Sequence, residues 1–190
     1  PEKYKHQMLG GWLAKAEGVI FSDNWQIGEF KKVGVSVFGQ DYGFAADENS
    51  LVETNIDVNN KIIYLKECFY LKGLTTSQIA ELNLKHAKNH LIVGDSAEPR
   101  LLHELKAKGC NVVKAIKGQG SITYGIALLQ DYDLIVEENS INLIKELNNY
   151  SWLEKKSKTP QDKFNHIIDA IRYAISYQLQ NPNRGNYFIS

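Results

Sequence analysis

Three runs of alternating apolar and polar residues open the regular part of the chain. The first, 33–41, ends at an acid, Asp41. The second, 51–58, alternates at period two, and the Asn59–Asn60 turn leads directly from it into the third, 62–70. Alternation at this period indicates strands, and a two-residue turn between two such runs indicates a hairpin. The pattern therefore predicts three successive antiparallel strands.

The rest of the chain changes between helical and short extended patterns. Thr75 and Gln78 have the Thr-x-x-Gln spacing of a capping box, which predicts a helix start. Another helix has a proline in its first turn, Pro99, and a glycine at its stop, Gly109. We expect helices at 75–88, 97–108, 122–130, 141–149 and 161–179, and strands at 91–93, 111–116 and 133–137.

This order of elements predicts an α/β fold with one mixed sheet. Right-handed crossovers place the fourth strand, 91–93, beside the first, so the strand order becomes 3-2-1-4-5 with helices on both faces. In such a sheet the ligand crevice lies beyond the carboxyl ends of neighbouring parallel strands. The first strand ends at Asp41, and the fourth is followed by Asp95. Two acids from distant parts of the sequence are therefore expected at one crevice.

Composition is typical of one globular domain. The chain has 190 residues, of which 43% are hydrophobic and 23% are charged, close to the globular average. No apolar run is long enough to span a membrane, and the polar residues 1–5 do not have the pattern of a signal peptide. Cys68 and Cys110 each lie in an apolar run, so we interpret them as reduced core residues of a cytosolic protein.

Charge is balanced overall but unevenly distributed. The chain has 22 basic and 22 acidic residues, which gives no net charge. Segment 41–57 carries five acids and no base, whereas segment 100–117 carries five bases and one acid. An acidic pit beside a basic face suits a metal-dependent enzyme that acts on a polyanion. Two ordinary solvated faces give the same counts, so the alternative stays open at this point.

Paired carboxylates at strand ends predict a divalent cation. Burial and mutual repulsion make such a pair costly, and a hard cation such as Mg²⁺ or Mn²⁺ removes both costs. The last helix supplies a candidate third acid, Asp169. It shares one helical face with His166, Arg172 and Tyr173. A helix that faces solvent can carry the same four residues.

Short motifs occur in a fixed order along the chain. They are Met8–Trp12, Gly39–Phe44, Gly73–Thr76, Gly94–Pro99, Lys117–Ile122 with Gly125–Ile126, Tyr150–Trp152 and Asn165–Tyr173. In this order and spacing they resemble the nuclease domain of the large terminase subunit of tailed double-stranded DNA bacteriophages, a member of the ribonuclease H-like superfamily. The resemblance covers about Gly34–Tyr177, most of the chain, and implies a ribonuclease H-like fold.

The resemblance also implies a site and a mechanism. The family's metal-binding acids fall on Asp41, Asp95 and Asp169, the same trio that the strand ends and the helix face indicate. His166 matches a position near the metals and is a candidate ligand or proton carrier. The implied reaction is phosphodiester hydrolysis with two divalent ions, Mg²⁺ or Mn²⁺, about 4 Å apart. Asp41 is the residue best placed to bridge both ions.

Two neighbouring acids leave alternatives open. Asp162 precedes His166 by one helical turn and is either its hydrogen-bond partner or an ordinary first-turn acid. After Phe44 the family commonly has a loop with Asp-Pro, whereas this chain has Asp47–Asn49. We interpret Glu48 as a loop substitution rather than an extra acid at the rim of the site.

DNA contact is expected from a basic, glycine-rich stretch. Its residues are Lys114, Lys117, Gly118 and Ser121, with Arg172 and Lys163 as weaker candidates. Backbone amides beside glycines can approach phosphates closely, although such glycines are also typical of a plain turn. Because phosphate contacts carry little sequence information, we expect largely nonspecific cleavage that weakens with salt.

The resemblance further implies a longer protein and its partners. No Gly-x-x-x-x-Gly-Lys-Ser/Thr loop occurs, so this chain does not bind ATP in the P-loop manner. We interpret 1–32 as a lead-in segment from an N-terminal packaging ATPase domain, 33–180 as the nuclease domain and 181–190 as a loose tail. The implied partners are double-stranded DNA, that ATPase domain, the small terminase subunit and the portal protein, in the host cytoplasm and without a membrane.

Two other functions remain open on the sequence. A resolvase or transposase-like nuclease of the same superfamily carries the same acids but prefers junctions or transposon ends. A noncatalytic module that docks on DNA or on the portal does not need the acids. The intact trio Asp41, Asp95 and Asp169 favours a nuclease that cuts concatemeric viral DNA during genome packaging.

Overall fold

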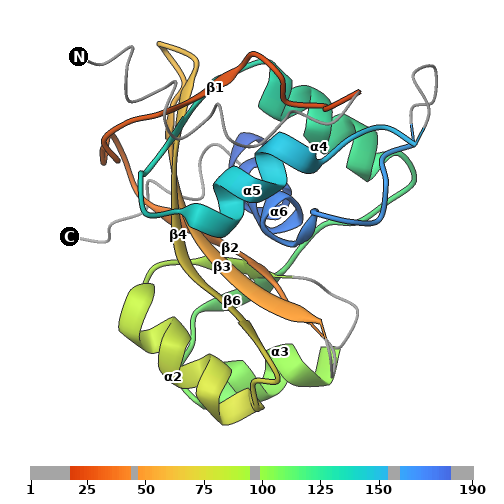
Figure 1. The fold of residues 1–190 in the computed structure, drawn as a ribbon. Coiled ribbons are helices and arrows are strands. Elements are labelled where there is room, and N and C mark those ends of the chain that lie inside the picture. The colour runs from red at the N-terminus through yellow and green to blue at the C-terminus, as the bar shows by residue number, and fades with distance from the viewer. Residues whose placement is uncertain (1–17, 44–46, 95–98, 154–158, 181–190) are drawn as a thin grey trace.

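A seven-stranded mixed sheet forms the centre of the computed structural model, which describes residues 18–43, 47–94, 99–153 and 159–180. Helices cover both faces of the sheet (Figure 1). The strands are β1 (Trp25–Ile27), β2 (Val37–Asp41), β3 (Glu48–Asp57), β4 (Ile62–Lys72), β5 (Ile92–Gly94), β6 (Val112–Lys114) and β7 (Asp133–Val136). The helices are α2 (Thr76–His86), α3 (Pro99–Ala107), α4 (Ser121–Gln130), α5 (Ile141–Asn149) and α6 (His166–Gln180).

The strands follow the order β1-β7-β4-β3-β2-β5-β6. β2, β3 and β4 pair antiparallel, and all the other neighbouring strands pair parallel. The expected order 3-2-1-4-5 is therefore confirmed for the five strands from β4 to β6. β7, which was expected as a strand but had no place in that order, lies beside β4. β1 adds a further edge strand that the sequence did not predict.

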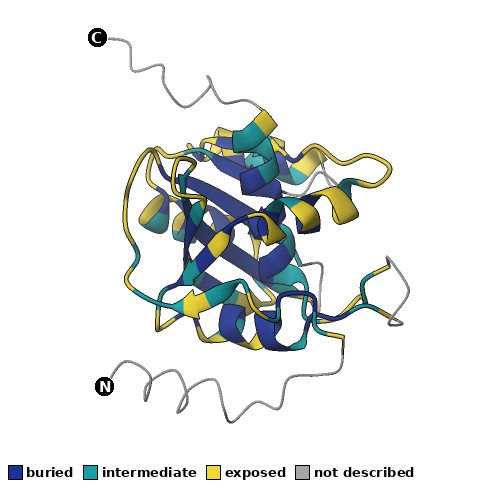
Figure 2. Cartoon of the chain, turned by 90° about the horizontal axis from the view of Figure 1, so that it is seen from above, coloured by how far each residue is buried: buried dark blue, intermediate teal, exposed yellow. Residues whose placement is uncertain are grey.

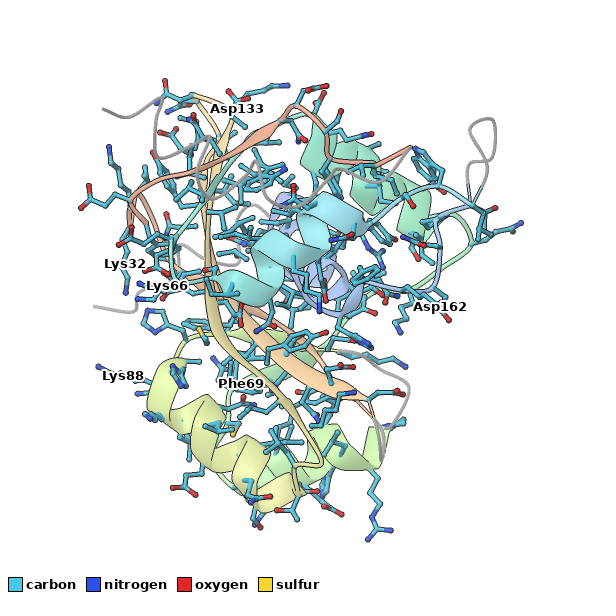
Figure 3. All side chains as sticks on the ribbon, viewed as in Figure 1. Lys32, Lys66, Phe69, Lys88, Asp133 and Asp162 are labelled. Atoms are coloured by element: carbon cyan, nitrogen blue, oxygen red, sulfur yellow. The ribbon has the colours of Figure 1, made fainter. Side chains whose placement is uncertain are left out.

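The two largest apolar cores lie on opposite faces of the sheet. The larger core lies under α4, α5 and α6 and includes Leu134, Ile168 and Ile171. The smaller core lies under α2 and α3 and includes Phe38 and Phe69 (Figure 3). Buried positions follow these layers, with the sheet enclosed and the outer helix faces exposed (Figure 2). The prediction of helices on both faces is confirmed.

The start of α2 agrees with the sequence prediction, whereas the start of α6 does not. The expected capping box of α2 is confirmed, since Gln78 N donates to Thr75 Oγ1 at 3.4 Å and Thr75 N donates to Gln78 Oε1 at 2.9 Å. α6 begins at His166 and not at Gln161 as expected. Phe164 adopts a left-handed conformation with φ 57°, which interrupts a helix at this point.

Residues 18–32, which were expected to belong to the lead-in segment, are part of the packed domain. The ring of Phe21 stacks on Tyr150 with centroids 6.3 Å apart, and Ile20 N donates to the Tyr150 carbonyl at 2.9 Å. β1 pairs with β7. These contacts place the start of the packed domain before the expected boundary at Val33. The rest of the lead-in, 1–17, and the tail, 181–190, lie outside the described residues.

Two other expectations concern the cysteines and membranes. Cys68 and Cys110 are both free thiols, as expected, but only Cys110 is buried in the core, and Cys68 is partly buried at its edge. Within the described ranges, no helix combines the length and the apolar character that a membrane crossing requires.

A very close backbone contact joins β2 to α6. A Cβ atom on Gly39 in β2 would overlap the backbone carbonyl of Ala170 in α6. Only a residue without a side chain allows this contact, so α6 lies directly on the strand. As a result, the first turn of α6 is held over the carboxyl end of β2.

We expect Gly39→Ala to lower the free energy of unfolding by about 3 kcal/mol or more, because backbone atoms must shift to admit one methyl group. Urea denaturation measures this change. Gly34→Ala is the matched control, since a Cβ atom on Gly34 meets nothing within 4 Å. Equal stability of the two variants would contradict the close contact.

Candidate active site

The carboxyl end of β2 meets the start of α6. Asp41, the last residue of β2, accepts a hydrogen bond on Oδ2 from Nδ1 of His166, the first residue of α6, at 3.0 Å. Nε2 of the same ring lies 3.3 Å from Oε2 of Glu48, the first residue of β3. The bond to Asp41 raises the pKa of His166 to about 9, against the opposing effect of burial. At neutral pH the ring is therefore charged and bridges two carboxylates.

Asp169 follows His166 by one helical turn. Its Oδ1 accepts two hydrogen bonds from Arg172, from Nε at 3.1 Å and from Nη2 at 2.5 Å. Burial raises the pKa of Asp169, Arg172 opposes this shift, and the negative charge of Asp41 adds to it. The two carboxylates are thus close enough to interact electrostatically.

Arg172 connects Asp169 to the start of α4. Its side chain is buried, with the whole residue only 4% exposed, and Nη1 lies 3.5 Å from the carbonyl oxygen of Ser121. A Cβ atom on Gly125 in α4 would lie 3.0 Å from Cδ of Arg172. A glycine at this position therefore leaves room for the arginine stem between α4 and α6.

A buried acid on α5 holds the start of α6. Glu146 is 2% exposed, and its Oε2 accepts hydrogen bonds from the backbone N–H groups of Ile167 at 2.8 Å and Ile168 at 3.1 Å. Burial raises the pKa of Glu146 to about 7, although these bonds and the nearby His166 oppose the shift. Glu146 was not among the site residues that the sequence indicated. An acid within the buried apolar face of α5 was the signal that could have found it.

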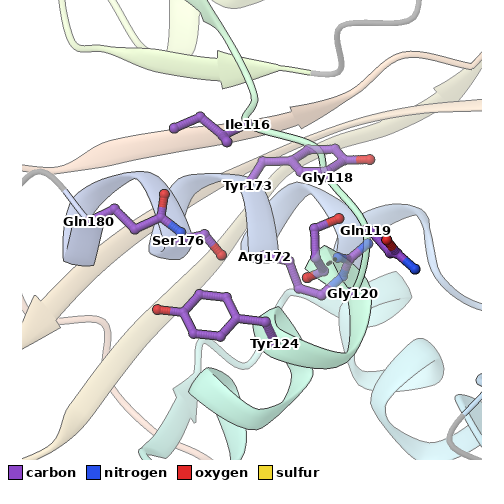
Figure 4. A pocket seen from close by; sticks show the side chains of 10 residues that line it. Ile116, Gly118, Gln119, Gly120, Tyr124, Arg172, Tyr173, Ser176 and Gln180 are labelled. Carbon is purple, nitrogen blue, oxygen red and sulfur yellow. Dashed lines mark hydrogen bonds between the residues drawn. The ribbon is translucent and has the colours of Figure 1, made fainter.

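A groove runs from Asp169 along α6 and consists of two adjoining cavities. α6 forms one wall, and segment 116–121 with α4 forms the other. The near cavity, about 440 Å³, is lined by Lys117, Gly118, Ser121, Ile122, Asp169, Arg172 and Tyr173. The far cavity, about 380 Å³, is lined by Ile116, Gly118, Gln119, Gly120, Ser121, Tyr124, Arg172, Tyr173, Ser176 and Gln180 (Figure 4).

Of the predicted metal-site residues, the structure brings Asp41, His166 and Asp169 to one place. Asp95 lies outside the described residues. Gly94, which precedes it, pairs in register with Gln40, which precedes Asp41. Over the described ranges alone, no three or more His, Cys, Asp or Glu side chains form a group arranged to hold a metal ion.

Of the two acids whose role the sequence left open, Glu48 lies beside His166 and Asp162 does not. Glu48 faces His166 from the first residue of β3, so its interpretation as a mere loop substitution is wrong. It also pairs with Lys72 at 3.1 Å. Asp162 instead accepts a hydrogen bond from Asn165 Nδ2 at 3.2 Å and lies on the outside of the molecule (Figure 3). The carboxylates beside the imidazole are therefore those of Asp41 and Glu48.

Most of the predicted DNA contacts line the groove. Lys117, Gly118 and Ser121 border the near cavity. Lys114 is exposed at the end of β6, outside both cavity linings. Arg172 lies in the wall of both cavities, but its bonds to Asp169 tie it to the carboxylates rather than to the open surface.

The sequence matches relatives over most of its length. A family model described as the terminase RNAseH-like domain matches residues 41–177. The large terminase subunit of Bacillus phage SPP1 is 30% identical over 94% of this chain and 46% of its own length. The PBSX phage terminase large subunit of Bacillus subtilis is 28% identical over 72% of this chain and 33% of its own length. The chain thus spans less than half of these relatives.

Solved structures of similar fold agree with these matches. The nuclease domain of the SPP1 large terminase, solved with bound Mn, superposes with a TM-score of 0.73 at 26% identity. That match covers 82% of this chain and 97% of the SPP1 domain. The P22 large terminase nuclease domain superposes with a TM-score of 0.69 at 14% identity, covering 88% of this chain and 95% of that one. The P22 likeness concerns the fold alone.

Glu146→Gln is expected to change how stability depends on pH. The raised pKa of Glu146 means that the folded protein binds a proton more readily than the unfolded chain between pH 4.5 and about 7. The free energy of unfolding therefore falls as pH rises through this window. The variant does not titrate there, so relative to wild type it should gain about 1–3 kcal/mol between pH 5 and pH 8.

Urea denaturation at both pH values tests this expectation. Asp169 shifts in the same direction but is present in both proteins, so it cancels from the difference to first order. Glu81→Gln, on the exposed face of α2, is the control for removal of a carboxyl group. If the stability difference between Glu146→Gln and wild type stays constant with pH, the pKa of Glu146 is not raised in the folded protein.

Proposed function

The chain belongs to the terminase RNase H-like domain family, and we propose on this premise that it is a divalent-metal-dependent endonuclease that cuts double-stranded DNA. One observation carries the proposal. Asp41 ends β2 and Asp169 lies in the first turn of α6, and the backbone contact between Gly39 and Ala170 holds these two elements together. His166 and Arg172 each offset the charge of one of these carboxylates, and a divalent cation would offset both together.

We propose that Asp41, Asp95 and Asp169 hold two Mg²⁺ or Mn²⁺ ions, with His166 as a proton carrier or, once its ring has lost a proton, as a further ligand. The oxygen donors suit hard cations, and a cation offsets both the burial of Asp169 and its repulsion from Asp41. Asp95 follows Gly94 at the end of β5, the parallel neighbour of β2. Bound ions of this kind activate a water molecule and stabilise the leaving 3′ oxygen.

The protein groups around the carboxylates orient them. The fork of Arg172 holds Oδ1 of Asp169 with two hydrogen bonds, which fixes the direction of this carboxylate. His166 holds Asp41 through Nδ1 and, because it is charged at neutral pH, can supply a proton. Glu146 anchors the helix turn that carries both His166 and Asp169.

DNA would lie along the near cavity of the groove. Lys117 supplies positive charge there, while Gly118 and Ser121 allow a phosphate to approach the backbone. Lys114 and Arg172 are the remaining candidate contacts. We assign these groups to phosphates rather than to base edges, so we expect little sequence specificity.

The relatives support a biological role for this chain. We propose that the chain is the nuclease portion of a large terminase subunit and cuts concatemeric viral DNA during packaging in the host cytoplasm. Its partners in this role are an N-terminal packaging ATPase domain, the small terminase subunit and the portal protein.

Asp41→Asn and Asp169→Asn are each expected to lower Mn²⁺-dependent cleavage of plasmid DNA by at least about 100-fold, because a ligand carboxylate is lost. Asp95→Asn should behave alike. Gel assays measure cleavage, and titration followed by electron paramagnetic resonance measures Mn²⁺ binding. Asp131→Asn, an exposed acid paired with Lys61, is the matched control. Full cleavage by the Asp169 variant would overturn the site.

DNA affinity should fall by at least about tenfold between 50 and 200 mM salt, because phosphate contacts release counterions. Lys117→Ala should reduce the slope of log affinity against log salt by about one. Fluorescence anisotropy in EDTA measures both effects without cleavage. Lys85→Ala on α2 provides the comparison, since α2 lies on the other face of the sheet. An unchanged slope in the Lys117 variant would show that Lys117 does not contact a DNA phosphate.

A further inference from the structure

We propose that the far cavity binds one unstacked nucleotide of the strand being cut, close to the scissile phosphate; this inference rests on the proposed nuclease function. An aromatic ring and hydrogen-bonding groups share the walls of the cavity. Tyr124 is 48% exposed and extends from α4 toward the face of α6 that carries Ser176 and Gln180 (Figure 4). Base faces stack on such rings, and Gln119 and Gln180 both donate and accept hydrogen bonds at base edges.

The far cavity is continuous with the carboxylate site. Gly118, Ser121, Arg172 and Tyr173 line both cavities. Ser176 follows Asp169 by two helical turns, a distance of about 10 Å along α6. Since successive phosphates of one strand are about 3.4 Å apart along a duplex, a group in the far cavity belongs to a nucleotide near the cut and not to the scissile phosphate itself.

Positive charge lies where the two cavities join. Lys117 Nζ is 5.3 Å from the centre of the Tyr173 ring, and the Arg172 guanidinium carbon is 5.6 Å from it. Tyr173 borders both cavities. A strand that passes from the carboxylates into the far cavity therefore carries its phosphate past Lys117, whereas the charge of Arg172 is already paired with Asp169.

The size of the far cavity excludes an intact duplex. Its volume of about 380 Å³ is that of a small-molecule site. One nucleotide must therefore leave the base stack to enter it, and this step is least costly where the base is already mispaired or unpaired. The structure thus assigns to this cavity a preference for DNA whose strands separate next to the cut.

Binding of a short single strand tests the site directly. The probe is fluorescently labelled hexathymidylate, measured by anisotropy in EDTA so that no cleavage occurs. Tyr124→Ala should weaken binding roughly 5-fold to 100-fold, the effect of losing one stacked base, whereas Tyr124→Phe should stay within about twofold of wild type. Val58→Ala, an exposed apolar residue at the β3–β4 turn, is the control. Unchanged affinity in Tyr124→Ala would overturn the proposal.

A cleavage assay separates this proposal from the nuclease function. Wild type should cut a duplex with a single mismatch faster than the fully paired duplex in Mn²⁺, and Tyr124→Ala should lose this preference. Cleavage by wild type with no effect of Tyr124→Ala on the preference would refute the nucleotide site and leave the nuclease intact. An absence of cleavage, together with Tyr124-dependent binding of hexathymidylate, would refute the nuclease and retain the site.

Discussion

The direct contact between β2 and α6 is the constraint on which the candidate site depends. Gly39 leaves no side chain between the strand and the helix, so the backbone of α6 rests on β2 at Ala170. Asp41 ends the strand two residues after Gly39, and Asp169 immediately precedes Ala170. A larger residue in place of Gly39 would separate these elements. The proximity of the two carboxylates is therefore a consequence of backbone packing.

Each buried charge at this place has a specific counterpart. Asp41 interacts with the charged His166, Asp169 with Arg172, and Glu146 with two backbone N–H groups of α6. Burial of ionised groups costs free energy that such partners recover only in part. The pKa values of Glu146 and Asp169 remain raised because these partners do not fully offset the free-energy cost of burial. Regions that tolerate this cost are often functional, because their geometry is held for chemistry rather than for stability.

The groove extends the site along α6, from Asp169 toward Gln180. Arg172 belongs to both features, since it holds Asp169 and also lines both cavities. Lys117 and Tyr173 lie at the same junction. In the proposed complex, a strand held by these groups and by Tyr124 would have one phosphate at the carboxylates and a nearby nucleotide of the same strand in the far cavity. Cleavage and strand separation would thus occur on one continuous surface.

The sequence by itself determined the elements whose signals are local. Alternation at period two located β2, β3 and β4, and handedness rules placed β5 beside β2. Strand ends and helical spacing then indicated Asp41 and Asp169. Only the tertiary structure decided the roles of Glu48 and Glu146 and the inclusion of β1, because their partners lie on other elements that no local pattern identifies. Hydrophobic period reports which face of an element is buried, whereas the partner of a buried charge depends on how separate elements pack.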